Sequence, residues 1–215
     1  MNIIVLGPQA SGKGTQAGLL AKKLGLQHLE LGGILREKTK EKSALAKEID
    51  LIMNKKGILV PDPIVKQITS EWIDKHGIER GIVFDGPPRN ITQYQDIEEI
   101  LAGRKEKIDK VIYLKVSRET SIKRIVSRRV CPQCDREYNL ITKPPLRDEL
   151  CDQCKKKLVQ RQDDTPEVVN KRLAVYSQLT EPLIEYIRNQ GILEEVDGER
   201  PIEVIHQDIL ARLEK

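Results

Sequence analysis

The four cysteines of the chain, confined to one short stretch, are the side chains with the clearest metal-binding chemistry. Cys131 and Cys134 form one C-x2-C pair, and Cys151 and Cys154 form a second. Paired cysteines at this spacing more often hold metal in a reducing compartment, whereas in an oxidising one they form disulfides. The spacing alone leaves a four-thiolate metal site and two disulfides as alternatives.

The segment GPQASGKGT, residues 7–15, has the spacing of a phosphate-binding loop. Gly7, Gly12 and Lys13 fit the pattern G-x-x-x-x-G-K, after a short apolar run and before an amphipathic stretch. Glycines let backbone N–H groups curl around phosphate oxygens, the helix N-terminus adds positive potential, and the lysine reaches the terminal phosphates. The other interpretation, a glycine-rich turn with a solvated lysine, fits the strand–loop–helix setting less well.

The composition is that of a globular protein without a membrane partner. Charged residues make up 33% and hydrophobic residues 39% of the 215 residues. No apolar run approaches the ~18 residues that span a bilayer. The opening MNIIVLGPQA has no basic region and too short an apolar one for a signal peptide, so we expect a cytosolic (cytoplasmic) protein. The net charge of +4 suits nucleic acid, an anionic substrate or a solvated surface, and interspersed Lys and Glu at 35–48 favour the last.

Strand and helix patterns alternate along the chain and predict a doubly wound α/β core. Short apolar runs predict buried parallel strands at 2–6, 26–30, 81–85, 110–116 and 191–197. Amphipathic patterns predict helices at 14–25, 64–75, 92–102, 118–128, 166–190 and 201–214. Thr165 and Pro166 begin one of these helices as N-cap and N1, and Pro182 is expected to kink it. Two insertions, 31–60 and 129–164, are expected to interrupt one core formed by 1–30, 61–128 and 165–215.

The residues after the loop lysine narrow the class. Gly14 separates Lys13 from Thr15, and this G-K-G-T form resembles the nucleoside monophosphate kinases, most closely the adenylate kinases. The similarity continues in GILVPDPIV (57–65), FDGPPRNITQ (84–93), RIVSRRV (124–130), QRQDD (160–164), NKRL (170–173) and VDGERP (196–201). The resemblance implies a P-loop core with a five-stranded parallel sheet, a helical monophosphate-binding insertion and a small lid. It also implies reversible Mg-dependent transfer, ATP + AMP to 2 ADP.

Site residues are implied by the positions that match the family motifs. Phosphoryl transfer needs cations around both phosphate chains and exclusion of water. The expected catalytic set is Lys13, Arg89, Arg124, Arg128, Arg161 and Arg172. Contacts to ATP are expected from Ala10, Ser11, Gly12, Lys13, Gly14, Thr15, Arg124, Arg128, Glu137, Tyr138 and Arg200. Contacts to AMP are expected from Leu31, Gly32, Arg36, Gly57, Ile58, Leu59, Gly86, Arg89, Gln93, Arg161 and Arg172. Arg124 and Arg128, four residues apart, are expected on one helix face.

Two metals are implied. Asp85 ends a buried strand beside the loop strand, where its carboxylate can hold Mg²⁺ through water, with a turn or N-cap aspartate as the alternative. In some adenylate kinases the lid is built on a structural zinc, and the four cysteines fall inside the corresponding segment. A lid of about 35 residues cannot build an adequate core alone, so one zinc per chain would stabilise it. His28, His76 and His206 are expected to be surface residues and not ligands.

The chain departs from the family pattern at four positions. Ala10 stands for a glycine of the loop, and Pro87 stands for the phenylalanine of D-G-F-P-R. In LGGILR, residues 31–36, Leu31 and Gly33 replace a threonine and an aspartate. Phosphate handling is therefore expected to be intact, while selectivity for the acceptor base is expected to be relaxed.

Alternative functions remain at this point. One is a nucleoside monophosphate kinase of other or broad acceptor specificity. Another is a P-loop NTPase with a nucleic-acid-binding zinc ribbon. Unpaired bases stack on aromatic side chains, and Tyr138 is the only aromatic residue of the lid, which argues against this alternative. No nucleic-acid partner is therefore expected. A monomer or small homo-oligomer is expected, with Leu140, Ile141 and Leu146 of the lid packing internally or against a second subunit.

Overall fold

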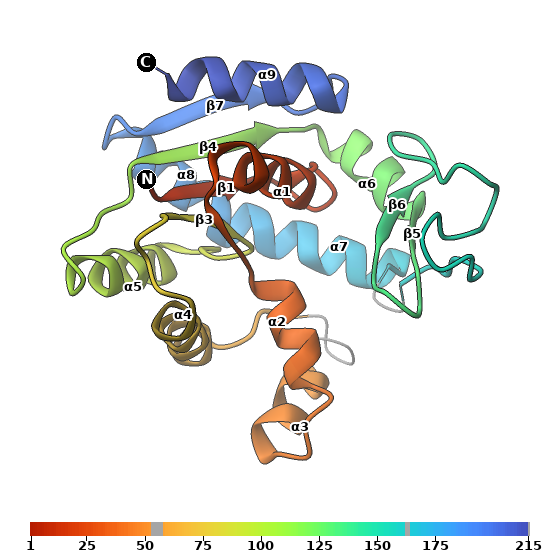
Figure 1. Ribbon diagram of the computed structural model, residues 1–215, viewed down its shortest axis with the longest axis horizontal. Coiled ribbons are helices and arrows are strands. Elements are labelled where there is room, and N and C mark those ends of the chain that lie inside the picture. Colours follow the sequence, from red (N-terminus) through yellow and green to blue (C-terminus); the bar gives the residue numbers. More distant parts are fainter. Residues whose placement is uncertain (53–57, 162–163, 215) are drawn as a thin grey trace.

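A five-stranded parallel sheet forms the centre of the protein (Figure 1). The structure, a computed structural model, describes residues 1–52, 58–161 and 164–214. The sheet has the order β2-β3-β1-β4-β7, with every neighbouring pair parallel. Its strands are β1 Ile3–Leu6, β2 Gln27–Glu30, β3 Ile82–Asp85, β4 Lys110–Lys115 and β7 Leu193–Asp197. Each lies within its predicted range, so the predicted α/β core is confirmed.

Helices cover both faces of this sheet. Ile3 and Val5 of β1 pack in one apolar cluster with residues of α1, Lys13–Leu24, and α9, Ile202–Leu213. Ile4 and Leu6 point the opposite way, because side chains alternate along a strand. They pack in a second cluster with α4, Asp62–His76, α5, Ile91–Ala102, and α8, Glu181–Arg188. Burial on both faces is why the central strands read as unbroken apolar runs.

The path of the chain opens a crevice at one edge of the sheet. After β1 the chain moves to one side for β2 and β3, and it then crosses to the other side for β4 and β7. Ligands of open α/β sheets bind beyond the carboxyl ends of the strands where the strand order reverses. The loop after β1 lies at this point.

The first insertion is helical, as predicted. It contains α2, Leu31–Lys38, and α3, Ala44–Asp50, which extend away from the sheet in Figure 1. Ser43 caps α3, since its hydroxyl accepts the N–H of Ala46 at 3.0 Å. Gly57, predicted to contact AMP, lies outside the described residues.

The helix before the second insertion ends earlier than predicted. The helix α6, Arg118–Val126, ends before residue 128, and β5, Arg128–Val130, pairs antiparallel with β6, Glu137–Asn139. The prediction of helix up to 128 is wrong because the carbonyl of Ser127 accepts the N–H of Leu140, at 3.0 Å, where the ladder begins.

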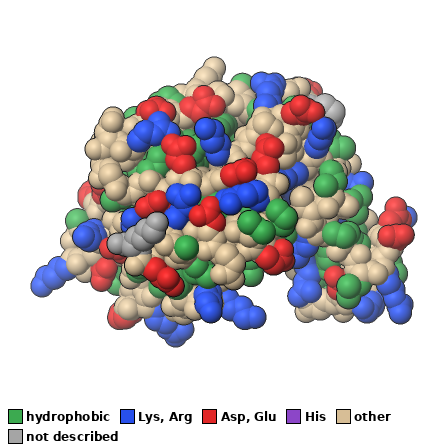
Figure 2. Space-filling view, turned by 90° about the horizontal axis from the view of Figure 1, so that it is seen from above, with side chains coloured by type: hydrophobic (Ala, Val, Ile, Leu, Met, Phe, Trp, Pro, Cys, Tyr) green, Lys and Arg blue, Asp and Glu red, His purple; other side chains and the backbone are tan. Residues whose placement is uncertain are grey.

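The lid surface carries apolar side chains and stands apart from the body. Leu140, Ile141 and Leu146 are exposed, with Leu146 88% accessible, so they do not pack internally as one alternative had it. Figure 2 shows the lid as a separate lobe on the right, while Lys, Arg, Asp and Glu are interspersed over the face that carries α9. No helix of the described ranges combines the length and apolar character that crossing a membrane would require.

The segment predicted as one helix over 166–190 is divided in three. It consists of α7, Pro166–Val175, a π-helical turn, Tyr176–Thr180, and α8. Pro182 lacks an N–H group, and its ring would clash with the carbonyl four residues earlier in a regular α-helix. The wider π turn just before Pro182 relieves this conflict. It also places the Thr180 hydroxyl where it donates to the carbonyl of Arg89 at 2.9 Å.

Candidate active site

A cleft with a volume of about 840 Å³ opens beyond the carboxyl ends of β1 and β3. It brings together predicted residues that are distant in the sequence. These are Ala10, Gly12, Lys13, Gly14, Thr15, Leu31, Gly32, Arg36, Ile58, Leu59, Asp85, Gly86, Arg89, Gln93, Arg128, Glu137, Tyr138, Arg161 and Arg172. A second cavity of about 340 Å³ lies behind the loop and is lined in part by Ser11, Arg124 and Arg200.

The loop after β1 leaves no room for a side chain at its first residue. A Cβ at Gly7 would lie 2.8 Å from the Leu114 carbonyl oxygen and 2.6 Å from Ser11 Oγ, so only glycine fits. The first turn of α1 has no acidic residue and no side-chain cap, so its N–H groups remain available to an anion. The Lys13 ammonium group donates to the carbonyls of Gly7 at 2.8 Å and Pro8 at 2.7 Å.

The backbone at Ala10 adopts a conformation that favours glycine, which is the usual residue at this position of the family. Its φ of 56° lies in the left-handed region, which costs a residue with a Cβ about 1–2 kcal/mol. The departure of this chain from the family pattern therefore adds strain to the loop at Ala10.

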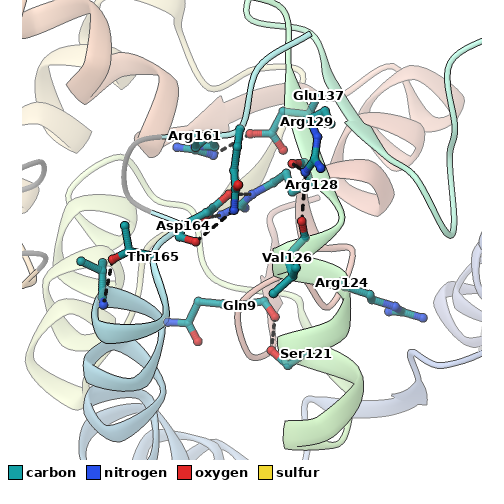
Figure 3. A network of polar contacts seen from close by, with 12 residues as sticks. Gln9, Ser121, Arg124, Val126, Arg128, Arg129, Glu137, Arg161, Asp164 and Thr165 are labelled. Carbon is teal, nitrogen blue, oxygen red and sulfur yellow. Dashed lines mark hydrogen bonds and ion pairs between the residues drawn. The ribbon is translucent and has the colours of Figure 1, made fainter. Parts of the chain in front are cut away.

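Three arginines that line the cleft are paired with carboxylates of the chain. Arg128 binds both oxygens of Asp164, whose side chain is fully buried, and its Nε lies 2.8 Å from Oδ2. Arg161 donates to Glu137 at 2.7 Å, and the two pairs join β5 and β6 at the base of the lid to the segment that carries Arg161 and Asp164 (Figure 3). Arg36 donates to Glu30 at 2.9 Å on the opposite wall. Phosphate oxygens are also anionic acceptors that a guanidinium group can bind bidentately, so they can replace these carboxylates.

Arg124 lines the second cavity and not the main cleft. Its guanidinium group is buried and donates to the carbonyl of Gly198 at 2.8 Å, pointing away from Arg128 in Figure 3. Burial lowers its pKa, with Glu199 and Asp197 acting against that shift. The expectation that Arg124 and Arg128 share a helix face is wrong, because Arg128 belongs to β5. Arg124 faces the second cavity and holds the back of the loop.

Arg200 and Tyr138 are also held by the protein itself. Arg200 pairs with Asp208 beside the second cavity. Tyr138 is buried, its hydroxyl donates to Cys151 Sγ at 3.5 Å, and it accepts the N–H of Asp152 at 2.8 Å. Tyr138 therefore belongs to the cysteine cluster as much as to the cleft wall.

The wall at the start of α2 carries a carboxylate that the sequence analysis did not single out, that of Glu30. Leu31 is buried and packs close to Gly86, where a Cβ would lie 3.2 Å from the Leu31 Cβ. A Cβ at Gly33 would lie 3.3 Å from the carboxylate of Glu30. Gly33 therefore makes room for Glu30, which brings a carboxylate to this wall in place of the aspartate that the family has at 33. The sequence signal was an acidic residue just before the altered motif.

Asp85 sits at the floor of the cleft. It is buried, and its Oδ2 would lie 3.1 Å from a Cβ at Gly14, so the carboxylate faces the loop. His28 Nε2 lies 3.5 Å from the same oxygen. The expectation that all three histidines are surface residues holds for His76 and is wrong for His28 and His206, which are partly buried. The position of His28 on β2, next to β3, was the available signal.

The four cysteines form a compact cluster. Their sulfur atoms all lie within 4.8 Å of one another, and Cys134 Sγ and Cys151 Sγ are 3.7 Å apart. Four thiolates about 2.3 Å from a tetrahedral ion are separated by about 3.8 Å. All four thiols are free, and ~2.05 Å would join disulfide sulfurs, so the two-disulfide alternative is not what the structure has. Hydrogen bonds from the Cys154 N–H and the Tyr138 hydroxyl lower the pKa of Cys151 to about 6, which favours the ligating thiolate.

Comparison with known sequences decides the family. Residues 5–192 match the family model described as adenylate kinase. The chain is 43% identical to an adenylate kinase of Archaeoglobus fulgidus over 215 residues, which cover 100% of this chain and 99% of the relative. The chain belongs to the adenylate kinase family.

Further adenylate kinases match at similar identity. One from Pseudothermotoga lettingae is 41% identical over 215 residues, 100% of this chain and 99% of its own length. One from Caldanaerobacter subterraneus subsp. tengcongensis is 40% identical over 209 residues, 97% of this chain and 94% of its own length. The chain is thus a phosphotransferase with adenylate kinase activity, acting on ATP, AMP and ADP. Similarity over the full length argues against a P-loop NTPase that carries a nucleic-acid-binding ribbon.

The pH dependence of this adenylate kinase should follow Lys13. Burial lowers the pKa of Lys13 from 10.5 to about 8, although Asp85 acts in the opposite direction. As pH rises through 8, the empty enzyme loses the charge that attracts phosphate, so kcat/KM for ATP should fall about tenfold per pH unit. Bound phosphates raise the pKa of the lysine, so kcat should stay level over this range.

Steady-state rates between pH 6 and 9.5 at saturating AMP test this expectation. A descending limb near pH 8 in kcat with unchanged KM would contradict it. Stability has the opposite sign, because between pH 8 and 10.5 the unfolded chain binds more protons at this lysine than the folded one. The contribution of Lys13 to stability therefore increases with pH in that window.

Proposed function

We propose that ATP binds on the loop after β1, AMP binds on the wall formed by α2 and the residues after β3, and the phosphoryl group passes directly between them. The observation that carries this proposal is the convergence of Lys13 with Arg36, Arg89, Arg128, Arg161 and Arg172 on one cleft. Charge that develops on the transferred oxygens is stabilised by donors already in place. The thiols belong to the metal cluster, so no covalent phosphoenzyme is part of the proposal.

The residues of the cleft fall into three groups by position: the donor loop, the wall assigned to AMP and the base of the lid. Lys13 and the N–H groups at the start of α1 would hold the donor phosphates, since they face the cleft at the end of β1. Arg36 and Arg89 lie on the wall assigned to AMP, and Arg128 and Arg161 come from the base of the lid. Guanidinium groups from both sides would then surround the reacting phosphates and exclude water.

Asp85 fits an indirect ligand of Mg²⁺. It offers a buried carboxylate that faces the loop beside Lys13, and hard oxygen ligands suit this ion. Mg²⁺ bound with the nucleotide supplies neutralisation of the β- and γ-phosphate charge. Asp85 itself would accept hydrogen bonds from the water molecules bound to Mg²⁺ and so orient them.

The lid cluster fits one structural zinc per chain. Its donors are four sulfur atoms, which Zn²⁺ binds tetrahedrally, and all four positions are filled by the protein. The zinc would stabilise residues 129–164, whose buried apolar cluster consists of the cysteines with Tyr138 and Leu158. We keep 31–60 as the monophosphate-binding insertion and 1–30, 61–128 and 165–215 as the core.

All the residues named for the reaction come from one chain, so a monomer would suffice for activity. This monomer would act in the cytosol. Sizing chromatography would reveal a small homo-oligomer, for which the exposed lid residues Leu140, Ile141 and Leu146 offer an apolar contact.

Selectivity for the acceptor base should be incomplete, because Leu31 offers only an apolar contact. A site that hydrogen-bonds its ligand rejects others by ~10⁴–10⁵, whereas an apolar contact is worth only ~1–3 kcal/mol. We expect AMP to be the preferred acceptor and other monophosphates to react measurably. Leu31→Thr should change that preference.

Rates with ATP and each of AMP, GMP, CMP and UMP, in wild type and Leu31→Thr, test both the activity and the selectivity. Wild type favouring AMP by more than ~10⁴, or a variant without effect, would show that Leu31 only packs against Gly86. No turnover of AMP at all would end the proposed function.

A further inference from the structure

The side-chain amide of Gln93 is held at both ends by groups of fixed polarity. Its Oε1 accepts the backbone N–H of Arg89 at 2.8 Å, and its Nε2 donates to Asp62 Oδ1 at 2.8 Å. A backbone N–H can only donate, and a carboxylate can only accept. The amide would lose both bonds if it turned over, so its orientation is determined by the chain.

Asp62 is itself fixed in place. It lies in the first turn of α4, next to the N-cap residue Pro61. The Asn90 side-chain amide donates to both of its oxygens, at 3.0 and 3.1 Å, while Asn90 Oδ1 accepts the N–H of Gln93 at 2.7 Å. The starts of α4 and α5 are thus joined through Asn90 and Asp62, and Asp62 cannot turn away from Gln93.

Gln93 retains hydrogen-bonding capacity for a ligand. It is only 2% exposed but lines the cleft, and its two protein bonds leave one N–H hydrogen and one lone pair. A glutamine amide pairs with adenine by accepting from N6 and donating to a ring nitrogen. On the edge that carries N1, guanine has an acceptor, O6, and a donor, N1–H, where adenine has a donor and an acceptor, so guanine would pair there with the amide turned over.

We propose that Asp62 is a positioning residue for base selection, acting by fixing which end of the Gln93 amide faces the acceptor base. The inference rests on the proposed acceptor site, in which Gln93 faces the base. Because Leu31 offers no hydrogen bond, the oriented amide is the side chain on which discrimination between AMP and GMP depends.

The experiment compares kcat/KM for AMP and GMP, with ATP and Mg²⁺ as the common donor, in wild type, Asp62→Asn and Asp62→Ser. The ratio of the two values should fall about tenfold in both variants, since one bidentate contact to a base is worth roughly that discrimination or more. The ratio is taken within one preparation, so a loss of folded protein cancels. Asp62→Ser keeps an oxygen at the start of α4 if Asp62→Asn folds poorly.

Asp74→Asn is the matched control. Asp74 lies on the same helix, α4. Its exposed carboxylate pairs with Arg104 and does not hold Gln93. Its AMP:GMP ratio should equal that of wild type. An equal fall in this variant would show a general effect of α4 and overturn the inference.

Gln93→Leu separates the inference from the proposed site. This change should lower the ratio, and adding Asp62→Asn should lower it no further, because the amide to be oriented is gone. A further fall in the double variant, or an unchanged ratio in both Asp62 variants, would overturn the role of Asp62 while leaving the acceptor site. An unchanged ratio in Gln93→Leu itself would instead contradict the proposed acceptor site.

Discussion

Replacing Lys13 with methionine should lower kcat by a factor of about 10²–10³, the usual loss when one preorganised donor to a charged transition state is removed. The ammonium group lies at the end of β1, where it bonds the carbonyls of Gly7 and Pro8 until phosphate displaces them. Methionine keeps the length of the side chain and removes only the charge and the donors. The loss should therefore appear in kcat as well as in kcat/KM.

Lys23→Met is the control, because Lys23 is an exposed lysine in the last turn of the same helix. It should retain wild-type kinetics. Thermal unfolding of Lys13→Met should show no decrease, since burial of the charge lowers the pKa of this lysine and opposes folding. A kcat near that of wild type would contradict the assignment of the loop as the donor site.

Removal of zinc should lower thermal stability and loosen the lid while the core sheet stays folded. The cluster of Cys131, Cys151, Tyr138 and Leu158 is small, so the proposed zinc would supply most of the free energy that orders residues 129–164. A loss of ~3 kcal/mol lowers Tm by about 6–12 °C in a protein of this size. Elemental analysis should find one zinc per chain before chelation and none after it.

Cys134→Ser should reproduce the effect of the chelator, and added Zn²⁺ should restore the chelated wild type but restore Cys134→Ser poorly. Circular dichroism should retain most of the helical signal, because the described helices lie outside 129–164. Thiols that react only after reduction would indicate disulfides in place of metal. Loss of all structure on chelation would contradict an inserted lid.

The sequence was sufficient for those parts of the fold that depend on local pattern. The apolar runs of β1 and β3 are buried on both faces, and the spacing of Gly7, Gly12 and Lys13 places the loop between β1 and α1. The C-x2-C pairs, together with the resemblance to kinases with a zinc lid, likewise predicted that four thiols would meet. In each case the residues that define the feature are close in sequence or repeat at a fixed period.

Long-range pairs could not be predicted in this way. Asp62 and Gln93 lie 31 residues apart, and the family-like segment GILVPDPIV does not indicate which side chain Asp62 contacts. The position of Arg128 relative to Arg124 was misjudged because helix α6 ends at Val126, where the lid ladder takes over the backbone hydrogen bonds. The π turn before α8 was likewise not apparent, although Pro182 indicated a disturbance.

The carboxylates paired with Arg36, Arg128 and Arg161 have a consequence for turnover in both directions. At the proposed nucleotide sites each carboxylate would be a tethered anion that competes with nucleotide at an effective concentration on the order of millimolar or above. Nucleotide binding would then be an ion exchange inside the cleft, in which a nucleotide phosphate replaces a carboxylate of the protein. Such exchange moderates affinity equally for substrates and products, so neither direction of a near-balanced reaction ends in a complex too tight to dissociate.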